Sequence, residues 1–260
     1  MFFEKDLPSM TVMINVEGKN GQPDSFGTGF WMTYPVGNSG AMSSVLITNK
    51  HVLPDNSSAI ALVLRKKDSN ENIILGSSIV IGIDAGQYFH VPHPSPTVDL
   101  ACIFLSGILN SEAHFRSLTL DFIDSGDLSD LHVGQSILFA GYPTGYYDKH
   151  NNLPLIRSGS IASIPEVDFD GRGCFMVDAQ VHAGSSGSPV FTTKKGQAYL
   201  VGVISERVIT TDNINYEENK NLQVSREIGL GIVIKGKLVL ELINHAKSEA
   251  ARLFPLSDFE

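Results

Sequence analysis

The chain has 260 residues, with 19 basic and 28 acidic side chains, a formal net charge of −9 and a pI near 5.3. This acidic balance argues against nucleic acid as the main partner, because phosphate binding needs clustered Lys and Arg side chains. No apolar stretch is long enough to cross a bilayer, and Glu4, Lys5 and Asp6 occupy the place where a secretory apolar region would lie. We therefore expect a cytoplasmic protein that makes no contact with membranes.

Short apolar or alternating segments recur along the chain and are separated by Gly, Pro, Asn, Asp and Ser, a pattern typical of antiparallel strands. The expected strands cover residues 11–16, 44–48, 59–64, 73–81, 100–105, 136–140, 174–179, 199–205 and 230–234. A more polar stretch, residues 106–131, is the best candidate for a connection between two halves. Only residues 237–253 show helical spacing of apolar side chains. The sequence therefore predicts an all-β fold with a C-terminal α-helix.

Three side chains of a serine hydrolase occur in the order His, Asp, Ser, each beside an expected strand. His51 follows residues 44–48, Asp99 precedes residues 100–105, and Ser186 lies in a Gly- and Ser-rich turn. A serine hydroxyl is a poor nucleophile near neutrality, so an imidazole must take its proton while a carboxylate orients the ring. We assign these catalytic roles to Ser186, His51 and Asp99.

The turn that carries the serine also predicts an oxyanion hole, which we assign to Gly184, Ser185 and Ser186. Glycine adopts dihedral angles that a side chain forbids, so Gly184 can aim neighbouring amides at one point. The donors expected there are the N–H groups of Gly184 and Ser186, each worth roughly 100- to 1000-fold in rate.

With these motifs the chain resembles the chymotrypsin-like (trypsin-fold) serine peptidases, and within them the bacterial HtrA/Deg-like and other cysteine-poor members. No PDZ-type docking domain is evident after the helix. The matching landmarks appear in the family's order, at residues 26–31, 46–52, 92–94, 98–101, 133–134, 140–143, 178–180, 184–189, 201–205 and 228–232.

The resemblance implies two antiparallel six-stranded β-barrels with an active site between them. Residues 1–120 would form the N-terminal barrel and linker, carrying His51 and Asp99. Residues 121–260 would form the C-terminal barrel, carrying Ser186, and the final helix. The implied activity is that of a serine endopeptidase that acts through an acyl-enzyme on a polypeptide substrate without a cofactor; an activating protein partner stays open.

The resemblance also assigns residues to substrate binding, with a pocket base, two walls and one loop contact. These residues are Gln180, His182, Ser205, Glu206, Arg207 and Gly229. Gln180 would lie at the pocket base, and since it is not an Asp, a preference for Lys or Arg is not predicted. Ser185 stands where members that mature by proteolysis carry an Asp that pairs with a new N-terminus. Activation by that ion pair is therefore not expected.

Cysteine and histidine usage gives no sign of a redox or metal site. The chain has only two cysteines, Cys102 and Cys174, which fits a reducing compartment, with Cys102 as a small buried hydrophobic residue. His90 and His93 form a pair but lack a third ligand at a convincing spacing. We therefore expect no metal.

Two other functions remain open at this level. An α/β-hydrolase esterase could use Ser186 with Asp212 and His245, but that fold needs repeated strand-helix units. Alternatively, the peptidase scaffold could serve as a catalytically silent or partner-activated binding module. The presence of all three reacting side chains favours the peptidase over the binding module.

Overall fold

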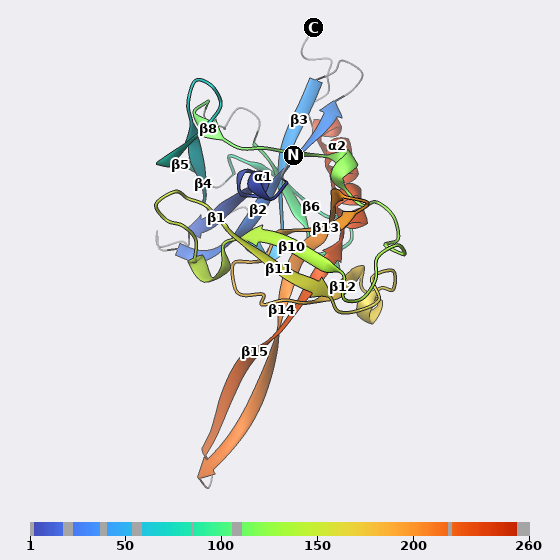
Figure 1. The fold of residues 1–260 in the computed structure, drawn as a ribbon. Helices are drawn as coiled ribbons and strands as arrows, with labels where there is room; N and C mark the ends of the chain where they lie inside the picture. Colours follow the sequence, from blue (N-terminus) through green and yellow to red (C-terminus); the bar gives the residue numbers. More distant parts are fainter. Residues whose placement is uncertain are drawn as a thin grey trace.

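The computed structural model describes residues 3–17, 23–36, 41–53, 59–84, 86–105, 111–217 and 220–253. Its elements are, in chain order, α1 (Phe3–Met10), β1 (Thr11–Glu17), β2 (Pro23–Val36), β3 (Ala41–Thr48), η1 (Lys50–Val52), β4 (Ile60–Lys67), β5 (Ile73–Ile83), β6 (Phe89–Pro92), β7 (Ala101–Phe104), β8 (Ala113–His114), β9 (Leu118–Thr119), η2 (Leu120–Phe122), β10 (Ser136–Gly141), η3 (Pro143–Gly145), β11 (Leu155–Ile161), η4 (Phe169–Gly171), β12 (Cys174–Asp178), β13 (Pro189–Lys194), β14 (Gln197–Glu217), β15 (Lys220–Lys235) and α2 (Gly236–Leu253). The η elements are single turns of 3-10 helix. Strands dominate the fold and the C-terminal helix is present, so both of these predictions are confirmed (Figure 1).

The C-terminal half forms a closed six-stranded barrel in the order β10-β11-β12-β15-β14-β13, as predicted. Its interior is apolar and includes Phe139, Phe175 and Val233. Side chains alternate between the two faces of a strand, and this alternation divides β13 between two cores. Val190 points into the barrel, whereas Phe191 joins the core outside it.

The N-terminal half does not form the six-stranded barrel that we expected. It is a nine-stranded sheet whose path runs β5-β4-β1-β2-β3-β7-β6, with β8 added to β4 and β9 added to β2. Among the described residues the end strands β5 and β6 do not pair, so the sheet stays open. β6 is only four residues long, and Pro92 at its end lacks an amide hydrogen. Leu75 and Val80 of β5 remain largely exposed.

The connection between the halves runs across both of them. Its first residues, 106–110, lie outside the described part of the chain. The rest crosses from β8, which pairs with β4, to β9, which pairs with β2, and then to Ile123, which forms a bridge with Leu200 of the barrel. The connection is therefore attached to the N-terminal sheet before it reaches the barrel.

Another apolar core lies between the halves and includes α2. It joins Phe30 of the sheet and Phe191 of the barrel with apolar residues of α2 such as Leu242 and Ile243. Burying each such side chain contributes about 1.5–3 kcal/mol. Both cysteines are buried and unpaired, and Cys102 belongs to this core, as expected. No helix in the described ranges combines the length and apolar character needed to span a membrane.

One element extends well beyond the rest. β14 and β15 form a long hairpin that leaves the barrel and projects away from the molecule (orange in Figure 1). Its pairing shifts register between Ile204 and Glu206 and again between Arg207 and Ile209. Such bulges bend a strand and increase its twist. They mark the place where the hairpin departs from the barrel.

Candidate active site

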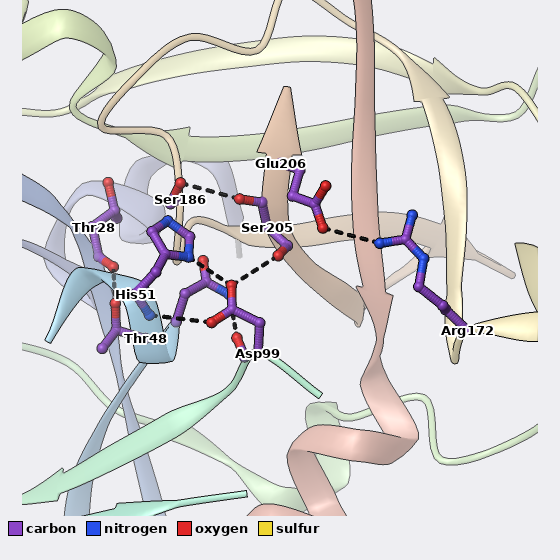
Figure 2. A network of polar contacts seen from close by, with 9 residues as sticks. Thr28, Thr48, His51, Asp99, Arg172, Ser186, Ser205 and Glu206 are labelled. Carbon is purple, nitrogen blue, oxygen red and sulfur yellow. Dashed lines mark hydrogen bonds and ion pairs between the residues drawn. The ribbon is translucent and has the colours of Figure 1, made fainter. Parts of the chain in front are cut away.

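His51 and Asp99 lie at the same end of two paired strands. β3 and β7 run antiparallel, with Thr48 opposite Ala101. His51 follows β3 within η1, and Asp99 lies two residues before β7, so the ladder brings the two side chains together. His51 Nδ1 is 2.6 Å from Asp99 Oδ2, and the His51 amide donates to Asp99 Oδ1 at 3.1 Å (Figure 2).

The carboxylate of Asp99 fixes the imidazole in one tautomer. An ionised carboxylate only accepts hydrogen bonds, so Nδ1 of His51 donates and Nε2 keeps its lone pair. Asp99 Oδ2 also accepts from the Ser205 hydroxyl at 3.1 Å, and its backbone carbonyl accepts from Asn49 Nδ2 at 2.6 Å. These bonds orient the ring with a proton-accepting nitrogen available.

The same contacts shift the pKa values of both groups. The hydrogen bond to Asp99 raises the pKa of His51 above 6.5; burial opposes this rise, and the charges of Asp99 and Glu206 add to it. For Asp99, burial is the largest single influence and raises the pKa. The hydrogen bonds from His51 and Ser205, together with the His51 charge, outweigh burial and leave the pKa below its usual range. The pair therefore favours a charged Asp99 next to His51.

Ser186 lies in the turn between β12 and β13 and faces this pair (Figure 2). Its hydroxyl donates to the backbone carbonyl of Ser205 at 3.1 Å. In the part of the chain that the structure describes, no hydrogen bond joins this hydroxyl to His51. Ser205 thus contacts both sides of the site, since its carbonyl holds Ser186 and its hydroxyl holds Asp99.

The turn before Ser186 requires glycine. Gly184 has φ +84°, and a Cβ there would lie 2.2 Å from the Phe26 ring and 2.5 Å from the Tyr142 carbonyl. The Ala183 carbonyl accepts from the Thr144 amide, so the N–H of Gly184, on the other side of the same peptide, points away from Thr144.

Thr28 of β2 fastens this turn to the N-terminal sheet. Its hydroxyl donates to the Gly184 carbonyl at 2.8 Å and accepts from the Tyr142 amide at 3.2 Å. Its own amide donates to the Ser186 carbonyl at 2.9 Å, and its carbonyl accepts from the Thr48 hydroxyl at 2.8 Å. Thr28 is fully buried. Sequence reasoning did not assign it a role, because its partner Gly184 is 156 positions away.

The three residues assigned to the oxyanion hole differ in whether their backbone N–H groups already have a hydrogen-bond acceptor. Within the described ranges, the N–H groups of Gly184 and Ser186 have no hydrogen-bond acceptor. The N–H of Ser185 donates to the His182 carbonyl at 3.0 Å and closes the turn, so Ser185 offers no free donor. Ser185 is therefore removed from the predicted donors of the oxyanion hole, which leaves Gly184 and Ser186. Its buried side chain instead accepts from the His182 amide at 3.4 Å.

The residues assigned to substrate binding form three separate groups. Gln180 lies against Gly229, where a Cβ would be 3.2 Å from the Gln180 amide nitrogen. Glu206 lines a small cavity of about 30 Å³ with Asp99 and Ser205, and it pairs with Arg172 at 3.1 Å (Figure 2).

His182 and Arg207 meet through a residue that the sequence analysis missed. Glu227 of β15 contacts Nδ1 of His182, and its other oxygen is 3.2 Å from Arg207. Glu227 lies opposite Ile209 in the hairpin ladder, so only the register of a hairpin that was not predicted could have located it. In the described part of the chain, no group of three or more His, Cys, Asp or Glu side chains could hold a metal ion.

The comparison with known families identifies the fold. Residues 27–203 match the trypsin-like peptidase domain, which is more than half of the chain. The chain belongs to the trypsin-like peptidase family. This confirms the resemblance to chymotrypsin-like peptidases, although no comparison singles out the HtrA/Deg-like members. A peptidase domain implies polypeptide substrates.

Two solved structures of low sequence identity are similar to this chain. One is similar over 94% of this chain and 93% of its own, with a TM-score of 0.54 and 12% identity, and is described as the atomic resolution structure of HBP. Another is Rv3671c from M. tuberculosis H37Rv, in an inactive form with serine replaced by alanine; it has 14% identity, covers 94% of this chain and 89% of its own, and has a TM-score of 0.49. No curated protein matches the sequence.

The esterase alternative is wrong. It requires a sheet with repeated strand-helix units, whereas this chain is an antiparallel β protein of the trypsin-like family. Asp212 lies on the projecting part of β14, beside Arg226, and His245 lies on α2 (Figure 1). The structure does not bring them together around Ser186.

Proposed function

We propose that the protein is a serine endopeptidase in which Ser186 is the nucleophile, His51 the general base and Asp99 the group that orients it. The observation that carries this proposal is the 2.6 Å contact between His51 Nδ1 and Asp99, which leaves Nε2 of the ring free on the side of Ser186 (Figure 2). The trypsin-like peptidase domain supports the same reaction class.

The reaction begins with a rotation of the Ser186 side chain. Its hydroxyl turns from the Ser205 carbonyl to Nε2 of His51, and a substrate amide takes the vacated place on that carbonyl. Active-site hydrogen bonds are often poorly aligned until substrate binds. Substrate binding thus aligns the nucleophile with its base.

Bond formation and proton transfer then follow in two halves. Oγ of Ser186 bonds to the scissile carbonyl carbon while His51 takes the hydroxyl proton. The C–N bond breaks, and His51 gives that proton to the leaving amine. Water then attacks the acyl carbon, its proton passes through His51 to Oγ, and the acid leaves. The amides of Gly184 and Ser186 stabilise the oxyanion in both halves.

The binding-module alternative keeps one supporting observation, which is that the Ser186 hydroxyl is bonded to Ser205 and not to His51. A scaffold that waits for a partner would keep the serine in this position. In that case a fluorophosphonate probe would label Ser186 only after the partner is added. For the peptidase we expect labelling of the protein alone.

The deciding experiment compares Ser186→Ala and His51→Ala with the unchanged protein, using a denatured polypeptide substrate and mass spectrometry. We expect each substitution to lower turnover by about a millionfold, since these groups act as one unit. Cleavage retained by purified Ser186→Ala protein would contradict the assignment. The cleavage sites also report the pocket preference, and with Gln180 at the pocket base we expect no dominance of Lys or Arg.

A further inference from the structure

β14 is paired on both edges inside the barrel and on only one edge outside it. On the β13 side its ladder ends with Pro189 opposite Val203. On the β15 side the ladder continues from Gly202 to Glu217. Among the described residues, no strand pairs with the β13 side of β14 beyond this point. The outer part of β14 therefore has one edge without a partner.

That edge becomes free at the reactive serine. The last backbone bonds on the β13 side join Ile204 to Gly187 and Ser188, both at 2.9 Å. The next carbonyl along the edge, that of Ser205, accepts from the Ser186 hydroxyl. A strand added beyond Ser205 would continue the line of β13 and place its end against Ser186.

The outer edge has the properties of a peptide-binding edge. Unpaired N–H and C=O groups on an edge strand are a template for another chain. A two-stranded hairpin is marginally stable in water, and a third strand adds stability. The outer part of β14 is also accessible, with Glu206, Ile209, Thr211 and Asp212 exposed.

We propose that the upstream substrate segment, which pairs with β14 near Ser205 at the site itself, continues along the projecting part of β14 as a third strand of the hairpin, as far as about Asp212. This proposal rests on the proposed peptidase function and extends it to the substrate class. β13 is antiparallel to β14, so a strand that takes its place runs toward Ser186. The amino-terminal end of the bound segment lies nearer the tip of the hairpin.

The length of the free edge of β14 determines how long an extended segment the substrate must supply. Strands advance about 3.4 Å per residue, so pairing as far as Asp212 engages roughly seven consecutive upstream residues. A folded loop cannot supply so long an extended segment. The preferred substrates are therefore unfolded or extended polypeptides, and their backbones contribute more to recognition than any single side chain.

The first test measures binding without catalysis. Fluorescent peptides with one common cleavage sequence and with about two to eight upstream residues are titrated into Ser186→Ala protein. Affinity should rise beyond the third upstream residue by about fivefold for each added backbone hydrogen bond. N-methylation of single upstream amides should weaken binding about fivefold at alternate positions only, because alternate residues of a strand point their N–H groups to the same side. Equal affinity for all lengths would overturn the proposal.

The second test shortens the edge so that it ends at Ile209. Residues 210–226 are replaced by Asn-Gly, a two-residue turn that closes a hairpin after the Ile209 and Glu227 pair. The shortened protein should lose the gain in affinity that comes from residues beyond about the fifth upstream position; a gain that persists beyond that length would overturn the proposal. Fluorophosphonate labelling of the same variant, with Ser186 intact, shows whether its site is folded. Because labelling tests the peptidase function and peptide length tests the hairpin, the two failures are distinguishable.

Discussion

The imidazole side and the serine side of the site are held in different ways. His51 and Asp99 adjoin the ends of neighbouring strands of one sheet and are joined by two direct hydrogen bonds. Ser186 comes from the barrel, its hydroxyl is bonded to Ser205, and its turn is fastened by Thr28 from the opposite half. In the proposed reaction the base is therefore positioned before substrate arrives, whereas the nucleophile and its oxyanion donors depend on contacts between the halves.

Among substitutions of the residues that support His51 and Ser186, the largest effect is expected on the imidazole side. Asp99→Asn keeps the size of the side chain but presents an amide to His51, which disfavours the tautomer that accepts the serine proton. We expect turnover to fall about 10⁴-fold. Steady-state kinetics on a fluorogenic peptide would measure this, with active-site titration as the control for folding. A loss of less than tenfold would show that the ring is oriented by something other than Asp99.

A smaller effect should follow from loosening the serine side. Thr28→Val keeps the branched shape but removes the hydroxyl that holds the Gly184 carbonyl. We expect turnover to fall about 10- to 100-fold through a misaligned oxyanion donor, with KM little changed. Thr28→Ser restores the hydroxyl and should recover most of the activity. If both variants lose activity equally, the hydroxyl is not the group that positions the turn.

The pH dependence of kcat/KM should also distinguish the imidazole side of the site from the serine side. The raised pKa of His51 means that the imidazole becomes charged as pH falls through a value above 6.5, and a charged ring cannot accept the serine proton. Below this midpoint kcat/KM should fall about tenfold per pH unit. Thr28→Val should leave the midpoint in place. Asp99→Asn should lower it, because Asp99 is the main cause of the raised pKa. A midpoint at or below 6.5 in the unchanged protein would contradict this account.

The smallest effect is expected where the two sides meet. Ser205→Ala removes the hydroxyl bond to Asp99 but keeps the backbone carbonyl that holds Ser186. We expect turnover to fall only a few-fold, since one hydrogen bond of this kind contributes about 1 kcal/mol. Peptide kinetics of Ser205→Ala, of Asp99→Asn and of the double variant would show whether the effect of Ser205 depends on Asp99. If the two losses simply multiply, Ser205 does not act through Asp99.

Sequence reasoning located features with a local signature. Strands with alternating or continuous apolar residues, the C-terminal helix and the Gly-rich turn around Ser186 all have such signatures, and each expected strand overlaps an observed one. The roles of His51, Asp99 and Ser186 stay predictions, which the experiments above test.

Features that depend on contacts between distant residues were not predicted. Closure of the N-terminal sheet depends on whether β5 and β6 pair, and no local pattern determines that. The link from Thr28 to Gly184 and the Glu227 contacts depend on how distant segments are brought together. The outer hairpin had a partial signal in the β-branched run from Val208 to Thr211, but its mixed polar residues did not alternate clearly.

The apolar core shared by both halves has a consequence for thermal unfolding. Phe30, Phe191 and Leu242 come from the sheet, the barrel and α2, yet they belong to one cluster. Separating the halves would expose this cluster to water, with a large cost in free energy and a rise in heat capacity. Calorimetry should therefore record one cooperative transition, in which the geometry around Ser186 disappears together with the rest of the fold.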